Sequence, residues 1–147
     1  MAHLGIAGAG LLGRLLAWTL SRQGHRVSVF DPAEGPAPRF DGQGAAAFTA
    51  AGLLSPLAER DCAGERLAAL GWRSLPLWQA IQQALPGTPW LSLQGSLLLA
   101  HRSDLGSAQR LLDKLPAGQA HAVSPTTLEP ALDRRLHGWL LPGEGQI

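Results

Sequence analysis

The sequence predicts an α/β fold that opens with a strand, a helix and a second strand. Three observations support this prediction. Residues 3–7 are short and apolar, as in a strand buried between helical layers. A glycine-rich turn at 8–13 is followed by apolar residues at helical spacing as far as Leu20. Residues 26–30 then read as a second strand that ends at Asp31, which completes the pattern of a βαβ unit.

The glycine-rich turn has the pattern GxGxxG. Its residues are Gly8, Ala9, Gly10, Leu11, Leu12 and Gly13. Gly8 permits the tight turn, Gly10 lets backbone N–H groups approach a pyrophosphate, and Gly13 lets the helix pack close to the strand. The helix should begin inside the turn and direct its N–H donors towards phosphates. We therefore predict a dinucleotide site, against the alternative of a glycine-rich turn in another α/β protein.

The acid at the end of the second strand narrows the choice of dinucleotide. Asp31 precedes Pro32 and a loop, rich in proline and glycine, that extends to residue 44. A carboxylate at this place accepts hydrogen bonds from both ribose hydroxyls of an adenosine and repels the 2′-phosphate of NADP. The sequence therefore fits FAD or NAD and disfavours NADP.

Residues 45–56 (AAAFTAAGLLSP) form a second informative stretch, which is rich in small side chains. This density suggests a helix start pressed against something flat or anionic. A well-packed alanine helix capped by Gly52 is an equal alternative. Thr49 carries a hydroxyl that could reach a phosphate or bond a backbone carbonyl.

The rest of the chain alternates helical and strand patterns. These predict a helix at 60–85, a strand–turn–strand at 90–101, a helix at 103–115, a strand at 120–124 and a last strand at 137–141. Pro76 should kink or break the first of these helices, and residues 86–89 form a turn. Gly95 marks the bend between the paired strands. Ser124 and Pro125 read as the N-cap and first residue of another helix.

Composition excludes several classes of protein. The chain has 147 residues, 46% of them hydrophobic, and a net charge of +1, which argues against disorder and against a nucleic-acid footprint. The single cysteine, Cys62, excludes an internal disulfide and a multi-cysteine metal site. His101, His121 and His137 lack the spacing of metal ligands. No signal peptide or membrane-spanning run is visible, so we expect a soluble, cytoplasmic protein.

Several stretches together carry a family resemblance. They are GAGLLG at the start, Asp31, AAGLLSP, GSLLLA, LEPAL and the terminal GWLLPGEGQI. In this order they resemble the D-amino-acid oxidase family of flavoproteins, and most closely its glycine oxidase and thiamine-pathway amine oxidase branch. The resemblance spans essentially the whole chain. It implies an FAD-dependent oxidoreductase that oxidises the C–N bond of a small amino acid or amine to an imine.

The resemblance also assigns roles to residues. In the family, FAD lies along positions that match the following residues of this chain: Gly8, Ala9, Gly10, Leu11, Leu12, Gly13, Asp31, Pro32, Thr49, Ala50, Ala51, Gly52 and Leu53. Ala46 and Ala47 stand where members often carry serine or threonine, so hydrogen bonds from those hydroxyls are missing here.

The resemblance further predicts the domain plan. It implies an FAD/NAD(P)-binding Rossmann-like βαβ domain, whose N-terminal part is 1–88, and the beginning of an α+β substrate domain at 89–147. Family enzymes are more than twice as long, so the chain looks like a truncated N-terminal portion that is inactive alone. The family's substrate-binding arginine and tyrosine residues come later, so no catalytic residue is assigned. Uncovered apolar faces and strand edges predict weak FAD binding and a need for a partner or a homo-oligomer.

Two other functions stay open on the sequence. An NAD-dependent dehydrogenase is compatible with Asp31, although AAGLLSP and the loss of βαβ alternation after residue 60 argue against it. A non-catalytic, dinucleotide-binding remnant is the other alternative. No GxSxG, P-loop or HExxH motif offers a different chemistry.

Overall fold

The computed structural model describes residues 1–35, 37, 45–87 and 90–147. Most of the expected loop at 32–44 and part of the expected turn at 86–89 therefore lie outside the described residues. The chain divides into two compact units, 1–51 and 52–147, and each is described by itself. This division does not test the prediction that cofactor and substrate parts meet at residue 88.

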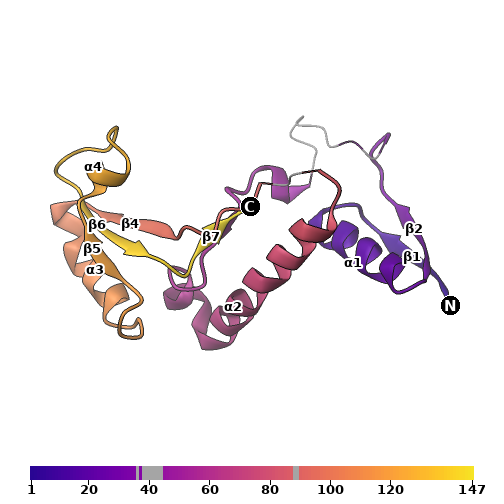
Figure 1. Cartoon of the computed structure of the whole chain (residues 1–147), viewed down its shortest axis with the longest axis horizontal. Helices are drawn as coiled ribbons and strands as arrows, with labels where there is room; N and C mark the ends of the chain where they lie inside the picture. The colour runs from indigo at the N-terminus through magenta and orange to yellow at the C-terminus, as the bar shows by residue number, and fades with distance from the viewer. Residues whose placement is uncertain (36, 38–44, 88–89) are drawn as a thin grey trace. The chain divides into compact units, whose positions relative to one another are not determined.

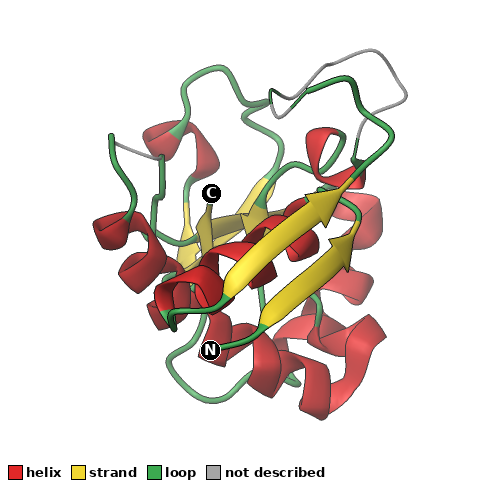
Figure 2. Cartoon of the chain, turned by 90° about the vertical axis from the view of Figure 1, so that its right-hand side faces the viewer, coloured by secondary structure: helices red, strands yellow, loops and turns green. Residues whose placement is uncertain are grey.

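The first unit is a βαβ arrangement, as the sequence predicted. Strand β1 (His3–Ala7) leads into helix α1 (Leu11–Arg22), and strand β2 (Arg26–Phe30) follows. The two strands are parallel, and His3 pairs with Arg26 at one end while Ala7 pairs with Phe30 at the other. Figure 2 shows the two strands side by side and running in the same direction. The α/β prediction is confirmed.

Helix α1 begins and ends where the glycines allow it. Gly10 is its N-cap in an extended conformation, so the helix begins inside the glycine turn. The C-cap is Gln23, and Gly24 follows with a positive φ of 84° that a residue with a side chain rarely adopts. Near this end the guanidinium of Arg22 lies 4.9 Å from the centre of the Trp18 ring, a cation–π contact.

The expected burial of β1 is wrong for this unit. Ile6 is the one buried residue of β1, and no residue of α1 is buried. Leu12 is 80% exposed and Phe30 is 66% exposed. The reason is geometric: one helix on a sheet of two strands cannot cover both faces of that sheet.

The small-residue stretch forms neither of the two helices considered. A short 3₁₀ helix, η1 (Ala46–Phe48), is followed by strand β3 (Leu53–Leu54), which pairs antiparallel with strand β7 (Gly145–Gln146). Between them Gly52 has a positive φ of 71°. Pairing with β7 keeps Leu53 and Leu54 extended, whereas the alanines contribute only the 3₁₀ turn before them.

Helix α2 (Arg60–Ala84) bends at a different residue from the one expected. Its one residue with non-helical backbone angles is Gly64, at φ 75° and ψ 170°, whereas Pro76 stays within the helix. Glycine accepts a positive φ without steric cost. The φ of proline suits a helix, so Pro76 removes one backbone N–H donor without ending the helix.

A three-stranded antiparallel sheet completes the second unit. Its order is β4–β6–β5, formed by β4 (Ser96–Ala100), β6 (His137–Leu141) and β5 (His121–Val123). Helix α3 (Leu105–Leu112), preceded by the 3₁₀ helix η2 (Arg102–Asp104), lies beside this sheet, and α4 (Pro125–Leu128) precedes β6 (Figure 1). These elements confirm the predicted strands at 96–101, 120–124 and 137–141.

Two details of this unit differ from expectation. The strand expected before Gly95 is reduced to a single bridge between Ser92 and Gln146. The strand at 137–141 is not the last, because β7 follows it. The core of the unit includes Leu57 and Leu141, which are 1% and 0% exposed. Among the described residues, no helix has the length and apolar character needed to cross a membrane.

Candidate functional site

The glycine turn of the first unit has the geometry expected of a dinucleotide loop. Gly8 has a positive φ of 98°, and its N–H donates to the Phe30 carbonyl oxygen at 2.7 Å. A Cβ built on Gly13 would overlap the carbonyl oxygen of Gly8. The backbones of the strand and the helix therefore approach so closely here that Gly13 has to be glycine.

The N-terminus of α1 is open to a ligand. Gly10 provides no side-chain cap, and no acidic residue occupies the first turn. The first N–H groups of a helix have no partner within the helix, and they carry the positive end of its dipole. Leu11 and Leu12, both exposed, begin this turn. An anionic group is the ligand that such a terminus favours.

The structure brings Asp31 to this turn. Its Oδ2 accepts a hydrogen bond from the Ala9 N–H at 2.6 Å, and its Oδ1 accepts one from the Ala33 N–H at 2.9 Å. The bond from Ala9, followed by that from Ala33 and the charge of Arg14, lowers the pKa of Asp31. The exposed carboxylate is therefore ionised at neutral pH. A carboxylate has about four acceptor positions, so it can still accept hydrogen bonds from hydroxyl groups.

Of the two hydrogen bonds expected for the Thr49 hydroxyl, to a phosphate or to a backbone carbonyl, the structure shows the bond to a carbonyl. Its hydroxyl donates to the Ala46 carbonyl oxygen at 2.9 Å, within the turn that ends η1. Its oxygen keeps acceptor capacity, but its proton is used locally. Ala50 and Ala51 follow as exposed residues of the first unit. Ala45 lies near the glycine turn, because a Cβ on Gly10 would be 3.7 Å from the Ala45 Cβ.

Gly52 and Leu53 belong to the second unit, where they contact the end of the chain. The Ile147 N–H donates to the Gly52 carbonyl oxygen at 2.9 Å, and Leu53 pairs with Gln146. A Cβ on Gly52 would overlap the carbonyl oxygen of Ile147. The stretches AAGLLSP and GEGQI, which lie far apart in the sequence, are therefore adjacent in the structure.

A buried acid in the second unit was missed by the sequence analysis. Glu144 is 0% exposed. Its Oε1 accepts hydrogen bonds from the N–H groups of Leu57 at 2.7 Å and Ala58 at 2.9 Å, and its Oε2 accepts one from the Ser96 hydroxyl. One signal could have revealed it: a single acid between two glycines in an otherwise apolar stretch, WLLPGEGQI.

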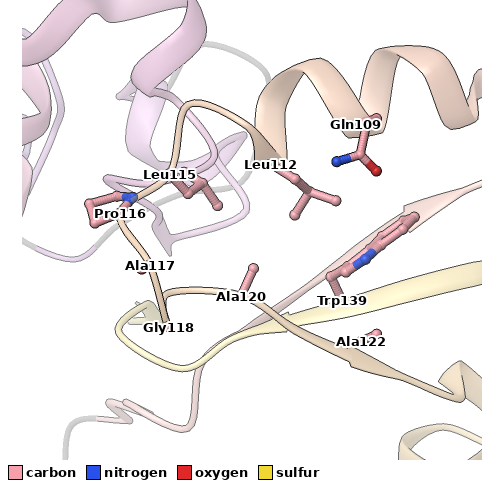
Figure 3. Close-up of a pocket in the computed structure, with 9 residues that line it drawn as sticks. All are labelled: Gln109, Leu112, Leu115, Pro116, Ala117, Gly118, Ala120, Ala122 and Trp139. Atoms are coloured by element: carbon pink, nitrogen blue, oxygen red, sulfur yellow. The ribbon is translucent and has the colours of Figure 1, made fainter.

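A pocket of about 340 Å³ lies in the second unit between α3 and the sheet. Leu112 and Leu115 border it on one side, and Ala120, Ala122 and Trp139 border it on the other. In Figure 3 the side chains of Leu112 and Trp139 approach each other across it. None of its lining residues is ionisable, so it has no acid–base chemistry of its own.

Among the described residues, no group of three or more histidine, cysteine, aspartate or glutamate residues gathers in a way that could hold a metal ion. The candidate site is the glycine turn with Asp31. The residues assigned by resemblance fall in both units, with Gly8 to Ala51 in the first and Gly52 and Leu53 in the second.

Comparison with known proteins agrees with this geometry. The family model described as DAO, FAD dependent oxidoreductase, matches residues 3–147. Among solved structures, the chain is similar to iminodiacetate oxidase from Chelativorans sp. BNC1, with a TM-score of 0.68 and 24% sequence identity. This similarity covers 99% of the chain but 40% of the oxidase, so the chain spans well under half of that protein's length. No curated protein is significantly similar in sequence.

The family model carries the assignment of the chain, and the structural neighbour shares its fold. The glycine turn, the open helix N-terminus and the ionised Asp31 fit the pyrophosphate and ribose of a dinucleotide such as FAD. The chain belongs to the DAO family of FAD-dependent oxidoreductases, as its resemblance to the D-amino-acid oxidase family predicted.

Proposed function

We propose that this chain supplies the FAD-binding portion of an oxidase that acts on the C–N bond of a small amino acid or amine. The observation that carries the proposal is the hydrogen bond between Asp31 and the Ala9 N–H at 2.6 Å, which sets an ionised carboxylate beside the glycine turn. Family membership supports FAD as the cofactor. The name of the neighbouring structure, iminodiacetate oxidase, supports an amine as the substrate class.

The roles of the residues in the first unit follow from their chemistry. Backbone N–H groups of the turn from Gly8 to Leu12 would bind the pyrophosphate, which the dipole of α1 also favours. Asp31 would accept hydrogen bonds from the ribose hydroxyls, and Pro32 would border the same ribose. Gly13 would hold α1 close to β1, so that the N–H groups stay directed at the phosphates.

Further cofactor residues are assigned by resemblance. Thr49, Ala50 and Ala51 in the first unit, and Gly52 and Leu53 in the second, would border the flavin region. Bound FAD would supply the two-electron acceptor that oxidation of a C–N bond to an imine requires. The chain's own contribution is to bind and orient the cofactor, and we assign no catalytic side chain within it. Residues 1–88 would form the first part of the cofactor domain and 89–147 a segment of the substrate domain.

Equilibrium binding tests this function. The full chain is titrated with FAD while flavin fluorescence is followed, and the titration is repeated with a large excess of NAD. We expect FAD to bind, with weak affinity because the apolar faces of the first unit are uncovered, and NAD to compete poorly. Binding of NAD without FAD would favour a dehydrogenase. Binding of neither dinucleotide would contradict the proposal.

Exposed apolar side chains in both units favour association with a partner or with a second copy of the chain. Leu12, Val29 and Phe30 of the first unit are exposed, as are Leu67 and Leu70 of α2 in the second unit. Burial of such side chains is favourable, so we include a partner or a homo-oligomer in the proposal. Light scattering coupled to size exclusion measures this directly. A monomer that melts in a single cooperative transition would contradict this part of the proposal.

A further inference from the structure

Three segments of the second unit meet around Glu144. We call them together the clasp, and they are Gly52–Ala58, Ser92–Ser96 and Leu141–Ile147. Backbone pairs join them: Leu54 pairs with Gly145, and Ser92 and Gln146 exchange two N–H···O bonds of 2.8 Å each. The three segments lie far apart in the sequence, so the clasp forms only in the folded chain.

Glycines let the backbones of the clasp approach each other. A Cβ on Gly52 or on Gly145 would meet backbone atoms of Ile147 or Ser92, respectively. Gly95 has a φ of 95°, and a Cβ there would lie 2.8 Å from the Leu141 carbonyl oxygen. The glycines in AAGLLSP, LQGS and PGEGQI therefore serve a single junction, although the sequence presents them as separate motifs.

The turn that leads into α2 lacks a cap of its own. Glu59 is the N-cap residue of α2, and its side chain makes no capping hydrogen bond. The preceding N–H groups of Leu57 and Ala58 are satisfied instead by Glu144, which lies 87 and 86 positions away in the sequence. Buried N–H groups need a partner, because an unpaired one carries the full cost of its desolvation.

We propose that Glu144 is a positioning residue for the cofactor segment of this unit. The β3–β7 pairing fixes Gly52–Leu54 at one end, and the Glu144 carboxyl group fixes Leu57–Ala58 at the other end. The Ser96 hydroxyl holds the second oxygen of the same carboxyl group. Glu144 thus sets the path of the backbone that carries Gly52 and Leu53. The inference rests on the proposed function, in which these two residues border FAD.

Substitution of Glu144 tests the inference in the full chain. E144A removes both acceptor oxygens, whereas E144Q keeps one oxygen for the two N–H groups and offers an amide to the Ser96 hydroxyl. E59A is the matched control, because Glu59 is an exposed glutamate beside the same turn. Three quantities are measured: hydrogen exchange of the peptide covering 53–58, FAD affinity, and the visible circular dichroism of bound flavin.

We expect E144A to accelerate exchange at Leu57 and Ala58 by roughly tenfold or more, since two backbone bonds to a buried acceptor are lost. FAD affinity should fall by about tenfold, and the flavin dichroism should change. E144Q should restore the exchange rate and the FAD affinity to within about threefold of wild type, because it keeps the acceptor for the N–H groups. E59A should resemble wild type. If E144A does not fold, S96A replaces it, with an expected effect of about two- to fivefold, because one hydrogen bond is lost.

Other results would contradict the positioning role of Glu144, and they distinguish it from the proposed function. Unchanged exchange in E144A, or faster exchange with unchanged FAD affinity and flavin dichroism, overturns the positioning role and leaves the proposed function intact. A wild-type chain that binds no FAD overturns the proposed function and the inference together. A purely structural Glu144 would lower the melting temperature without changing flavin dichroism well below that temperature.

Discussion

Each unit of this chain contains an acid that accepts backbone hydrogen bonds, but the two acids differ in how far away in the sequence their donors lie. In the first unit the candidate site is built around one glycine turn, with the Asp31 side chain 22 positions from the Ala9 N–H that it binds. In the second unit Glu144 binds N–H groups 86 and 87 positions away. The first arrangement can be inferred from a motif in the sequence, whereas the second depends on the completed fold. Substitutions in the two units should therefore have separable effects.

The largest effect is expected for G13A in the first unit. The new Cβ would overlap the Gly8 carbonyl oxygen, so the strand and helix must move apart. We expect a loss of about 3 kcal/mol in the free energy of unfolding, and FAD affinity reduced at least about a hundredfold. Hydrogen exchange should accelerate in peptides from 1–51 and stay unchanged in peptides from 52–147.

A matched control is G106A. Gly106 lies in α3, where the nearest atom to an added Cβ is Arg110 Nη1 at 3.8 Å. Alanine is the better helix former, so G106A should be neutral or stabilising by up to about 1 kcal/mol. Equal destabilisation by the two substitutions would contradict the close packing assigned to Gly13.

The second unit offers a comparison between two glycines of similar φ. Gly52 and Gly64 have φ values of 71° and 75°, but only Gly52 has a backbone atom in the path of an added Cβ. We expect G64A to cost about 1–2 kcal/mol for its sparsely populated backbone angles, and G52A about 2–3 kcal/mol because the added Cβ also opens the junction with Ile147. Urea unfolding followed by tryptophan fluorescence measures both. Costs that differ by less than experimental error would show that the junction contributes nothing.

A smaller effect is expected for D31N, which alters the site without a steric clash. Asparagine lacks the charge and one of the two acceptor oxygens, so FAD affinity should fall by about 10- to 100-fold. D113N is the control, because Asp113 is an exposed acid in a local bond to Gln109 at 2.7 Å. Equal affinity in D31N and wild type would contradict the assignment of Asp31 to the ribose.

Asp31 should also affect stability in a pH-dependent manner. Its pKa is lower in the folded chain than the ordinary value of 3.8. A lowered pKa means that the stabilisation is present above the unfolded value and is lost as the pH falls through the folded value. An acid titration of wild type should therefore lose this contribution below pH 3.8, and D31N should not show that loss.

The smallest effect concerns a surface pair in the second unit. Hydrogen bonds from the side chain and then from the backbone N–H of Arg135 lower the pKa of the Asp133 carboxyl group to about 2. Carboxyl titration by NMR should show this value in wild type and a return towards 3.8 in R135A. The pair is exposed, so the stability of the chain should hardly change. A measured pKa near 3.8 in wild type would show that the pair does not form in solution.

The sequence predicted the features of the first unit that depend on residue types at fixed, short spacing. The glycine turn, the parallel strands and Asp31 follow from residues whose types are required at fixed spacing. The helix bend was assigned to Pro76 but lies at Gly64, because Gly64 adopts a positive φ that interrupts the helical backbone. Local propensity was a poor guide at 45–56, where the distant strand β7 supplies the partner of β3.

The clasp shows this limit most clearly. The stretch at 45–56 was expected to be helical on its alanines, yet β3 forms there because Gly145 and Gln146 pair with it. Glu144 was overlooked because a lone acid has no spacing that indicates a partner. Its three hydrogen-bond donors, Leu57, Ala58 and Ser96, are brought together only by folding. Hydrogen bonds between segments this far apart in the sequence could not be predicted from the local pattern of residues.

The most direct test of the central claim is a hydrogen-exchange footprint of FAD on the full chain. The claim is that the glycine turn, the start of α1 and Asp31 bind the cofactor. It predicts slower exchange in peptides covering 8–12 when FAD is added, with no change in peptides covering 105–112 of α3. Protection confined to the second unit, or no protection at the glycine turn under conditions where FAD binds, would contradict the claim.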